Sequence, residues 1–309
     1  MPAYRDGPHF HEAVASVLAQ SQGDLELIVT DDSGGDLRAT AESFDDPRVR
    51  YLPNPRRLGF AANHCRALGA AGGEYVALLH HDDRWEPGFL AATTAALDAH
   101  PDVGMVVVGA EDIDGAGASL GSRPARMPPG KQPDALELLL ARDFMLMLPS
   151  LMIFRRRALE ANRRPWPDNN IADVTMYLDV AKRGWKMFYV AEMLAQYRNH
   201  PEQASVQTVR HRRDTAALWG SYRFKDPRHE RLRRLRVAEA LLSQAGIEVR
   251  EGEPAEARRA LRGAARLSPR SIGPRWVAIW LLSFIQGVAP GMHDRWTRVR
   301  DPVRERHRG

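Results

Sequence analysis

Hydrophobic and polar positions follow two different periods along the first 114 residues. Short apolar runs rich in β-branched residues are typical of buried strands, and each run ends in polar residues or glycine. Between these runs, apolar residues recur at helical spacing in segments that end at glycine or proline. The pattern predicts strands within 25–35, 48–54, 74–83 and 103–114, and helices at 10–19, 59–73 and 88–101.

This alternation predicts an α/β fold with a mainly parallel central sheet flanked by helices. Two polar clusters follow predicted strands, namely Asp31–Asp32 and the run His80, His81, Asp82 and Asp83. Ligands of open α/β sheets bind outside the carboxyl ends of the strands. The two clusters therefore predict one shared site at this edge of the sheet.

The pattern changes after residue 114. Residues 115–133 are rich in glycine and proline and are predicted to form a long loop. A helix at 134–142, an apolar stretch at 144–156, a helix at 173–184 and a strand at 186–200 follow. Beyond about residue 205 the pattern is wholly helical. We therefore expect a domain at 1–205, with halves at 1–114 and 115–205, and a helical C-terminal region at 206–309.

Composition limits the class of protein. The chain is 44% hydrophobic and 27% charged, which is typical of a globular protein. Its single cysteine, Cys65, excludes an internal disulfide framework and suits a reducing compartment. The N-terminus lacks the apolar region of a signal peptide, and the apolar segment 276–289 is shorter than the roughly 20 residues of a spanning helix. We expect a cytoplasmic protein, soluble or peripheral at the inner face of the cell membrane.

The positive charge is concentrated in one segment. The net charge is +5, and residues 210–236 hold ten basic residues against three acidic ones. This segment indicates either an anionic partner or a solvated helix face. It lacks the interleaved aromatic residues of single-strand binders, so no nucleic-acid partner is expected. The apolar segment 276–285 either packs in the core or lies on a membrane surface.

The acidic clusters allow two interpretations on their own. Paired carboxylates at a strand end are typical ligands of Mg²⁺ or Mn²⁺, which prefer oxygen donors. Asp82 or Asp83 would equally serve as the N-cap of the helix that follows. Asp31–Asp32, followed by serine and two glycines, also has the chemistry of a turn.

The order of the segments resembles that of the family 2 glycosyltransferases, which have the GT-A fold. The resemblance covers about residues 2–205. It rests on PAYRDG (2–7), AVASVLAQ (13–20), LELIVTDDSGG (25–35), VRYLPNPRRLGFAAN (49–63), GEYVALLHHDDRWEPGFL (73–90), PSLMIFRRRAL (149–159), IADVTMYLDVAKRG (171–184) and YRNHPEQAS (197–205).

The resemblance assigns roles to individual positions. Tyr4 matches the aromatic residue that stacks on the nucleotide base, and Asp31–Asp32 match the pair that reads the base and ribose. Asp173 matches the general base that acts on the acceptor hydroxyl. The implied metal ligands are Asp82, Asp83 and His200. The implied nucleotide-binding set is Pro2, Tyr4, Asp31, Asp32, Asn54, Gly59, Asn63 and Asp82.

The activity that the resemblance implies is an inverting glycosyl transfer. A nucleoside-diphosphate sugar, with UDP or dTDP favoured, would donate its sugar to a hydroxyl of a glycan or lipid-linked acceptor. A divalent cation, Mn²⁺ or Mg²⁺, would neutralise the leaving diphosphate, while a carboxylate takes the proton of the attacking hydroxyl. Peripheral membrane contact would involve residues 206–309.

The chain departs from the family pattern at three points. His80 stands where an acid is usual, and Ala172 stands where an acid precedes the base, which leaves Asp168 and Asp179 as substitutes. The chain also begins inside the first motif, so we expect the family's first strand to lie upstream and its two neighbours to lack backbone partners. His80 and Ala172 keep a second hypothesis open: a degenerate, non-catalytic nucleotide-sugar-binding protein.

Overall fold

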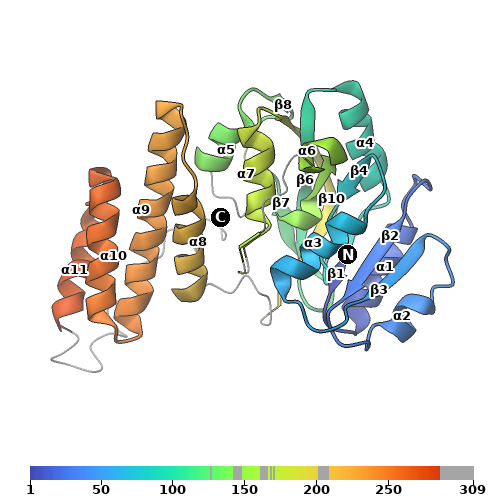
Figure 1. Ribbon diagram of the computed structural model, residues 1–309, viewed down its shortest axis with the longest axis horizontal. Coiled ribbons are helices and arrows are strands. Elements are labelled where there is room, and N and C mark those ends of the chain that lie inside the picture. The colour runs from blue at the N-terminus through green and yellow to red at the C-terminus, as the bar shows by residue number, and fades with distance from the viewer. Residues whose placement is uncertain are drawn as a thin grey trace. The chain divides into compact units, whose positions relative to one another are not determined.

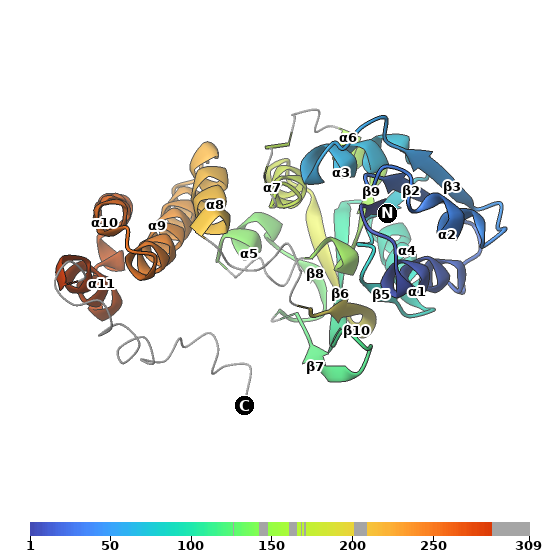
Figure 2. The same cartoon turned by 90° about the horizontal axis from the view of Figure 1, so that it is seen from below.

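The computed structural model describes residues 1–125, 127–141, 148–160, 166–167, 169, 171–200 and 209–285. The chain divides into two compact units, Met1–Val206 and Gln207–Gly309. The first unit mixes strands and helices, while the described part of the second is helical (Figures 1 and 2). The division lies next to the boundary expected near residue 205.

The elements of the first unit follow the predicted alternation. They are β1 (Pro2–Ala3), α1 (Pro8–Leu18), β2 (Leu27–Asp31), α2 (Arg38–Glu42), β3 (Val49–Pro53), α3 (Phe60–Ala70), β4 (Tyr75–Ala77), β5 (Arg84–Trp85), α4 (Phe89–Ala99), β6 (Val103–Ile113), β7 (Ser119–Arg123), β8 (Gly130–Gln132), α5 (Ala135–Ala141), a 3₁₀ turn (Pro149–Leu151), β9 (Met152–Arg155), α6 (Arg156–Glu160), α7 (Val174–Lys182) and β10 (Lys186–Arg198).

The first sheet contains three parallel strands in the order β1–β2–β3. Its central strand, β2, is buried at every residue, as its apolar run predicts. Asp31, the last residue of β2, lies opposite Ala3 on one side and Pro53 on the other. Asp31 and Asp32 therefore lie at the carboxyl end of this sheet, next to the ends of both neighbouring strands.

The second sheet has the order β4–β9–β6–β10–β5, with β7 also paired to β6 and β8 to β10. The two long strands β6 and β10 run parallel, and the other pairings of this sheet are antiparallel. The α/β class is thus confirmed, with parallel pairing throughout the first sheet and mixed pairing in the second.

The segment 115–133 differs from its prediction, because it contains the strands β7 and β8 rather than only a loop. Its glycine and proline content disfavours strands, but the long neighbours β6 and β10 supply hydrogen-bonding edges. Pairing with a preformed edge has outweighed local propensity at these two short strands.

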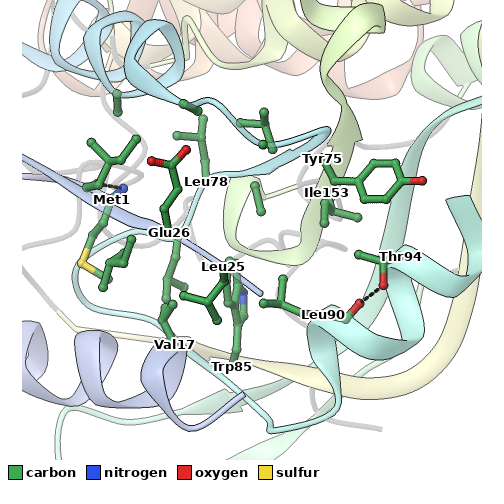
Figure 3. A pocket seen from close by; sticks show the side chains of 18 of the residues that line it. Met1, Val17, Leu25, Glu26, Tyr75, Leu78, Trp85, Leu90, Thr94 and Ile153 are labelled. Atoms are coloured by element: carbon green, nitrogen blue, oxygen red, sulfur yellow. Dashed lines mark hydrogen bonds between the residues drawn. The ribbon is translucent and has the colours of Figure 1, made fainter. Parts of the chain in front are cut away.

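A cavity of about 520 Å³ lies between β2 of the first sheet and β4 of the second. Figure 3 shows apolar side chains such as Leu25, Leu78 and Ile153 around it, together with the Glu26 carboxylate. Among the described pairings β4 bonds only to β9, and β1 lies beside only the last two residues of β2.

The second unit contains the helices α8 (Val209–Ser221), α9 (Pro227–Arg250), α10 (Pro254–Leu267) and α11 (Pro274–Ile285). A hydrophobic cluster formed by α9, α10 and α11 includes Val249, Leu261 and Ile279, with Trp276 and Trp280 packed against it. The opposite face of α11 exposes Val277, Leu281 and Phe284. Among the residues that the structure describes, every helix is too short or too polar to cross a lipid bilayer.

Candidate active site

The Asp32 carboxylate anchors the loop that leads into α3. Its Oδ1 accepts hydrogen bonds from the Asn54 Nδ2 at 2.8 Å and the Leu58 backbone nitrogen at 2.6 Å. Its Oδ2 accepts one from the Gly59 nitrogen at 2.8 Å. Gly59 has a φ of 85°, a left-handed conformation that favours glycine. Three of the roughly four acceptor positions of this carboxylate are therefore used inside the protein.

Asn63 and Asp31 extend this network around the end of β2. The Asn63 side chain donates to the carbonyls of Ala3 and Thr30, at 3.2 and 3.3 Å, and accepts from Asn54 at 2.9 Å. Asp31 accepts from the backbone nitrogen of Ser33 and the hydroxyl of Tyr51. The structure thus brings together Asp31, Asp32, Asn54, Gly59 and Asn63, with β1 and its Pro2 alongside.

Tyr4 follows β1 and remains 40% exposed. Its ring meets His81 edge-to-face, with 4.8 Å between the ring centroids, and the Arg5 guanidinium lies 5.6 Å from the Tyr4 centroid. Burial lowers the pKa of His81 to about 4, so this imidazole is neutral at physiological pH. Tyr4 therefore connects the end of the first sheet to His81, which lies in the turn after β4.

The histidine–aspartate cluster, His80, Asp82 and Asp83, lies in the turn between β4 and β5. One potential ligand atom from each of these residues lies within 4.8 Å of the other two. His200, beyond the end of β10, places its Nε2 3.0 Å from the Asp82 Oδ2. The carboxylates of Asp82 and Asp83 and the imidazole of His80, with or without that of His200, form a donor set that fits a divalent first-row cation.

Asp83 has a second role as a buried anchor. Its Oδ2 accepts a hydrogen bond from the Ser150 hydroxyl, and its Oδ1 accepts from the Arg198 backbone nitrogen at 2.9 Å. The alternative that Asp82 or Asp83 caps the next helix is wrong, because α4 begins at Phe89 with Gly88 as its N-cap.

Arg198 holds the cluster from behind. Its fully buried guanidinium donates to the Asp82 carbonyl at 2.8 Å and to the Glu12 carboxylate at 2.6 Å. It also donates to the carbonyls of Asp114 and Gly115, both at 3.2 Å. One side chain thus joins α1, the turn after β4 and the loop after β6.

The two carboxyl groups of the cluster differ in how readily they ionise. Burial, together with the neighbouring Asp82 carboxylate, raises the pKa of Asp83 well above its usual range. Burial also opposes ionisation of Asp82, but His81, His80 and the bond from His200 hold the pKa of Asp82 below its usual value. Ionisation of the pair is therefore favoured at Asp82 over Asp83.

His64 on α3 is a site residue that the sequence analysis missed. Its Nε2 lies 3.3 Å from the His80 Nε2, and its Nδ1 lies 2.8 Å from the Phe60 carbonyl oxygen. Its only sequence signal is a histidine on the inner face of a small-residue helix, which is more often a core residue. Ser150 and Arg198 are likewise part of the motifs quoted above, but they were not predicted as site residues.

Asp173 is the residue before α7, at the N-cap position, and is 8% exposed. Its side chain makes no capping hydrogen bond. Burial raises the pKa of Asp173 to about 7, against the opposing effect of the backbone N–H groups of Asp173 and Val174. A carboxyl with this pKa is suited to proton transfer near neutral pH.

The surroundings of Asp173 are also buried. Ala172 is fully buried, and the Thr175 and Tyr177 hydroxyls have no hydrogen-bond partner among the described residues. Asp179 is a buried residue further along α7, while Asp168 lies outside the described residues. No hydrogen bond between described residues joins Asp173 to the Asp32 network or to the histidine–aspartate cluster, so its role as base stays a prediction.

Comparison with known proteins identifies a family over this region. The sequence profile of glycosyl transferase family 2 matches residues 1–162, more than half of the chain. A relative from Escherichia coli, WfgD, is named as a UDP-Glc:α-D-GlcNAc-diphosphoundecaprenol β-1,3-glucosyltransferase. It is 35% identical over 86 residues, which cover 28% of this chain and 34% of WfgD. The chain spans 33%, 13% and 57% of the length of three curated relatives that it matches.

Solved structures show the same fold. S. aureus TarS in complex with UDP-GlcNAc has a TM-score of 0.63 and 14% identity, covering 93% of this chain and 90% of that chain. The mannosyltransferase PcManGT from Pyrobaculum calidifontis, in complex with GDP-Man and Mn²⁺, has a TM-score of 0.57 and 17% identity. That match covers 96% of this chain and 86% of that chain.

Proposed function

This chain belongs to glycosyl transferase family 2, and we propose that it transfers a sugar with inversion from a nucleoside-diphosphate sugar to a hydroxyl group. The acceptor is a glycan or a lipid-linked glycan. The observation that carries this proposal is the pair of polar sites at the strand ends, the Asp32 network after β2 and the histidine–aspartate cluster after β4. Tyr4 connects the two through His81.

The nucleotide is proposed to bind at the Asp32 network, with the exposed Tyr4 ring against its base. The network holds the loop at Leu58–Gly59 rigid, so the remaining acceptor position of Asp32 is preorganised for a ligand. UDP is the favoured nucleotide, because the donor in the name of WfgD and the ligand of TarS are both UDP-sugars. PcManGT binds GDP-Man, so GDP is the competitor in the binding test.

A divalent cation fits the donor set of the histidine–aspartate cluster. Asp82, Asp83, His80 and His200 would hold it, and Mn²⁺ is present in the related fold of PcManGT. When bound, such a cation supplies Lewis-acid stabilisation of the charge on the departing diphosphate.

Asp173 is proposed as the general base. In its ionised form the carboxylate accepts the proton of the acceptor hydroxyl while the hydroxyl oxygen bonds to the anomeric carbon. The bond from that carbon to the diphosphate breaks on the opposite face, so the configuration inverts without a covalent intermediate. The raised pKa of Asp173 makes it a stronger base than an ordinary carboxylate.

The test is a donor screen with purified full-length protein. Binding of UDP-, dTDP- and GDP-sugars with and without Mn²⁺ is measured calorimetrically, and release of the nucleoside diphosphate is measured with and without glycan acceptors. Metal-dependent release of UDP supports the transferase. Binding without any release, in the presence of a broad acceptor set, would favour the non-catalytic nucleotide-sugar binder that His80 and Ala172 keep open.

Peripheral membrane contact through α11 is the second part of the proposal. Its exposed face is apolar at Val277, Leu281 and Phe284, and Ile272 before the helix is 51% exposed. Residues 254–285 hold six arginines and one acidic residue. An exposed apolar face in a strongly basic segment suits the interface of an anionic membrane, where a lipid-linked acceptor would be found.

Vesicle co-sedimentation tests this contact. Phosphatidylglycerol-containing vesicles are expected to retain the protein, and pure phosphatidylcholine vesicles to retain less. The double substitution Leu281→Ser with Phe284→Ser is expected to abolish retention. Leu120→Ser, at an exposed leucine of β7, is the matched control. Unchanged retention of the double variant would argue against membrane contact through this face. If the wild type sediments as a dimer in ultracentrifugation and the double variant as a monomer, the face instead binds a second copy of the chain.

A further inference from the structure

Two histidines from different elements meet at the edge of the candidate cation site. The Nε2 atoms of His64 on α3 and His80 after β4 are 3.3 Å apart, and the ring planes are nearly perpendicular at 84°. His80 belongs to the histidine–aspartate cluster, whereas His64 does not. The function proposed above assigns no role to His64.

The hydrogen bonds of His64 determine where its proton lies. A carbonyl oxygen only accepts hydrogen bonds, so the Nδ1 that faces the Phe60 carbonyl at 2.8 Å must carry the hydrogen. His64 is 4% exposed, so its neutral form is favoured, and a neutral imidazole has a single N–H. The Nε2 of His64 is therefore an acceptor.

The proton of His80 follows from that of His64. An acceptor at 3.3 Å requires a donor opposite it, so the Nε2 of His80 carries its hydrogen. A neutral imidazole has only this one N–H. The second nitrogen of His80, Nδ1, is then left with its lone pair free of a proton.

The surroundings hold both rings in place. His64 is 4% exposed, and its ring lies against that of Phe60 with 4.0 Å between centroids. The backbone nitrogen of His80 donates to the Ser150 hydroxyl, which itself bonds to Asp83. The orientation of His80 is thus tied to one of the carboxylates with which it would share a cation.

We propose that His64 is a positioning residue that holds His80 in its Nε2-protonated tautomer, so that the His80 Nδ1 is available as a nitrogen ligand to the cation. This inference rests on the proposed function for the presence of the cation. A nitrogen ligand in place of a carboxylate favours first-row transition ions over Mg²⁺. The site is therefore expected to bind Mn²⁺ in preference to Mg²⁺.

The first test reads the tautomers directly. Protein labelled with ¹⁵N-histidine gives long-range ¹H–¹⁵N spectra in which the two tautomers have different patterns, and His64→Gln and His80→Gln assign the two rings. Without metal, His80 is expected to show a protonated Nε2 and His64 a protonated Nδ1. Added Mn²⁺ should broaden the His80 Nδ1 signal first. A protonated Nδ1 on His80 would overturn the proposal.

The second test measures Mn²⁺ affinity by electron paramagnetic resonance of the free ion. His64→Phe keeps the ring but removes the acceptor, and it is expected to weaken Mn²⁺ binding by about tenfold while changing Mg²⁺ binding less. His64→Gln keeps an acceptor oxygen near the Nε2 position and is expected to retain most of the affinity. Thermal melts of both variants establish that they fold.

His100→Gln is the matched control, since His100 is a half-buried histidine that stacks on Phe188 at the end of α4. It is expected to leave Mn²⁺ affinity unchanged. Equal affinities of the Phe and Gln variants at position 64, or no Mn²⁺ binding by the wild type, would overturn the proposal. Retained Mn²⁺ binding and tautomers without any sugar transfer would count against the proposed function and leave this assignment standing.

Discussion

Two Asp–Asp pairs follow strands of the first domain, and their carboxylates have different partners. Asp32 accepts three hydrogen bonds from the loop at Asn54–Gly59, all from neutral amides. Asp82 has the imidazole of His200 at its Oδ2, and His80 and Asp83 lie within reach of a common ion. The same dipeptide thus serves once to position a loop and once to offer ligand atoms, because the partners differ.

Asp173 sharpens this comparison, because among the described residues this buried carboxyl has neither kind of partner. Asp173→Asn is expected to reduce transfer about 10²–10⁴-fold while nucleotide binding is retained. Wild-type activity should rise with pH through about 7, since only the ionised form is a base. Steady-state kinetics from pH 5 to 9 with calorimetric UDP binding check this, and wild-type turnover in the variant would exclude the assignment.

Asp173 also makes stability depend on pH, in the opposite direction to a carboxylate that is paired with a positive charge. The pKa of Asp173 is about 7 in the folded protein, above the unfolded value of 3.8, so the folded state binds more protons between these values. Stability is therefore lost as pH rises through this window. Asp173→Asn should raise the free energy of unfolding at pH 8 by up to about 4 kcal/mol. Urea unfolding at pH 5 and 8 measures the difference in free energy of unfolding between the variant and the wild type. This difference should be smaller at pH 5.

Asp82→Asn tests the ligand side of the comparison. It removes the negative charge of the carboxylate that would bind the cation. Mn²⁺ binding is therefore expected to weaken, and transfer is expected to fall at least about 10²-fold. The melting temperature should change little, because the amide retains an oxygen toward His200. A variant that melts far below the wild type would instead show that Asp82 also stabilises the fold, as Asp32 is expected to do.

Asp32→Ala tests the structural side. Three donors lose their acceptor, and the free energy of unfolding is expected to fall by about 2–4 kcal/mol, measured by urea unfolding. Asp31→Ala, which removes the acceptor of two donors in the same pair, serves as the comparison and should cost less. Equal losses would show that the two carboxylates contribute alike.

Ser150→Ala is expected to have the smallest effect. It leaves one oxygen of the buried Asp83 and the His80 backbone nitrogen without their partner, and it should cost about 1–3 kcal/mol. Ser150→Thr keeps the hydroxyl and is the control. If alanine and threonine variants unfold alike, the contribution of Ser150 comes from packing rather than from its hydroxyl.

Several polar residues that a motif places along one strand end also lie together in the structure. Asp32, Asn54, Gly59 and Asn63 all belong to one network, as their order along the chain indicates. His64 and Arg198 were not singled out, because a helix face and a strand end do not reveal which distant groups they meet. The strands β7 and β8 were missed for the same reason, since only β6 and β10 give them an edge to pair with.

The sequence by itself determined the alternation of strands and helices, the boundary near residue 205 and the polar residues at two strand ends. These features depend on periodicity and local turn chemistry, which nearby residues specify. The tertiary structure alone decided which carboxylate is satisfied internally and which has histidines beside it. His200 meets Asp82 across 118 positions of the chain, and Ser150 meets Asp83 across 67. Hydrogen bonds and burial at such separations depend on how the sheets pack, and they determine which partners each carboxyl group has.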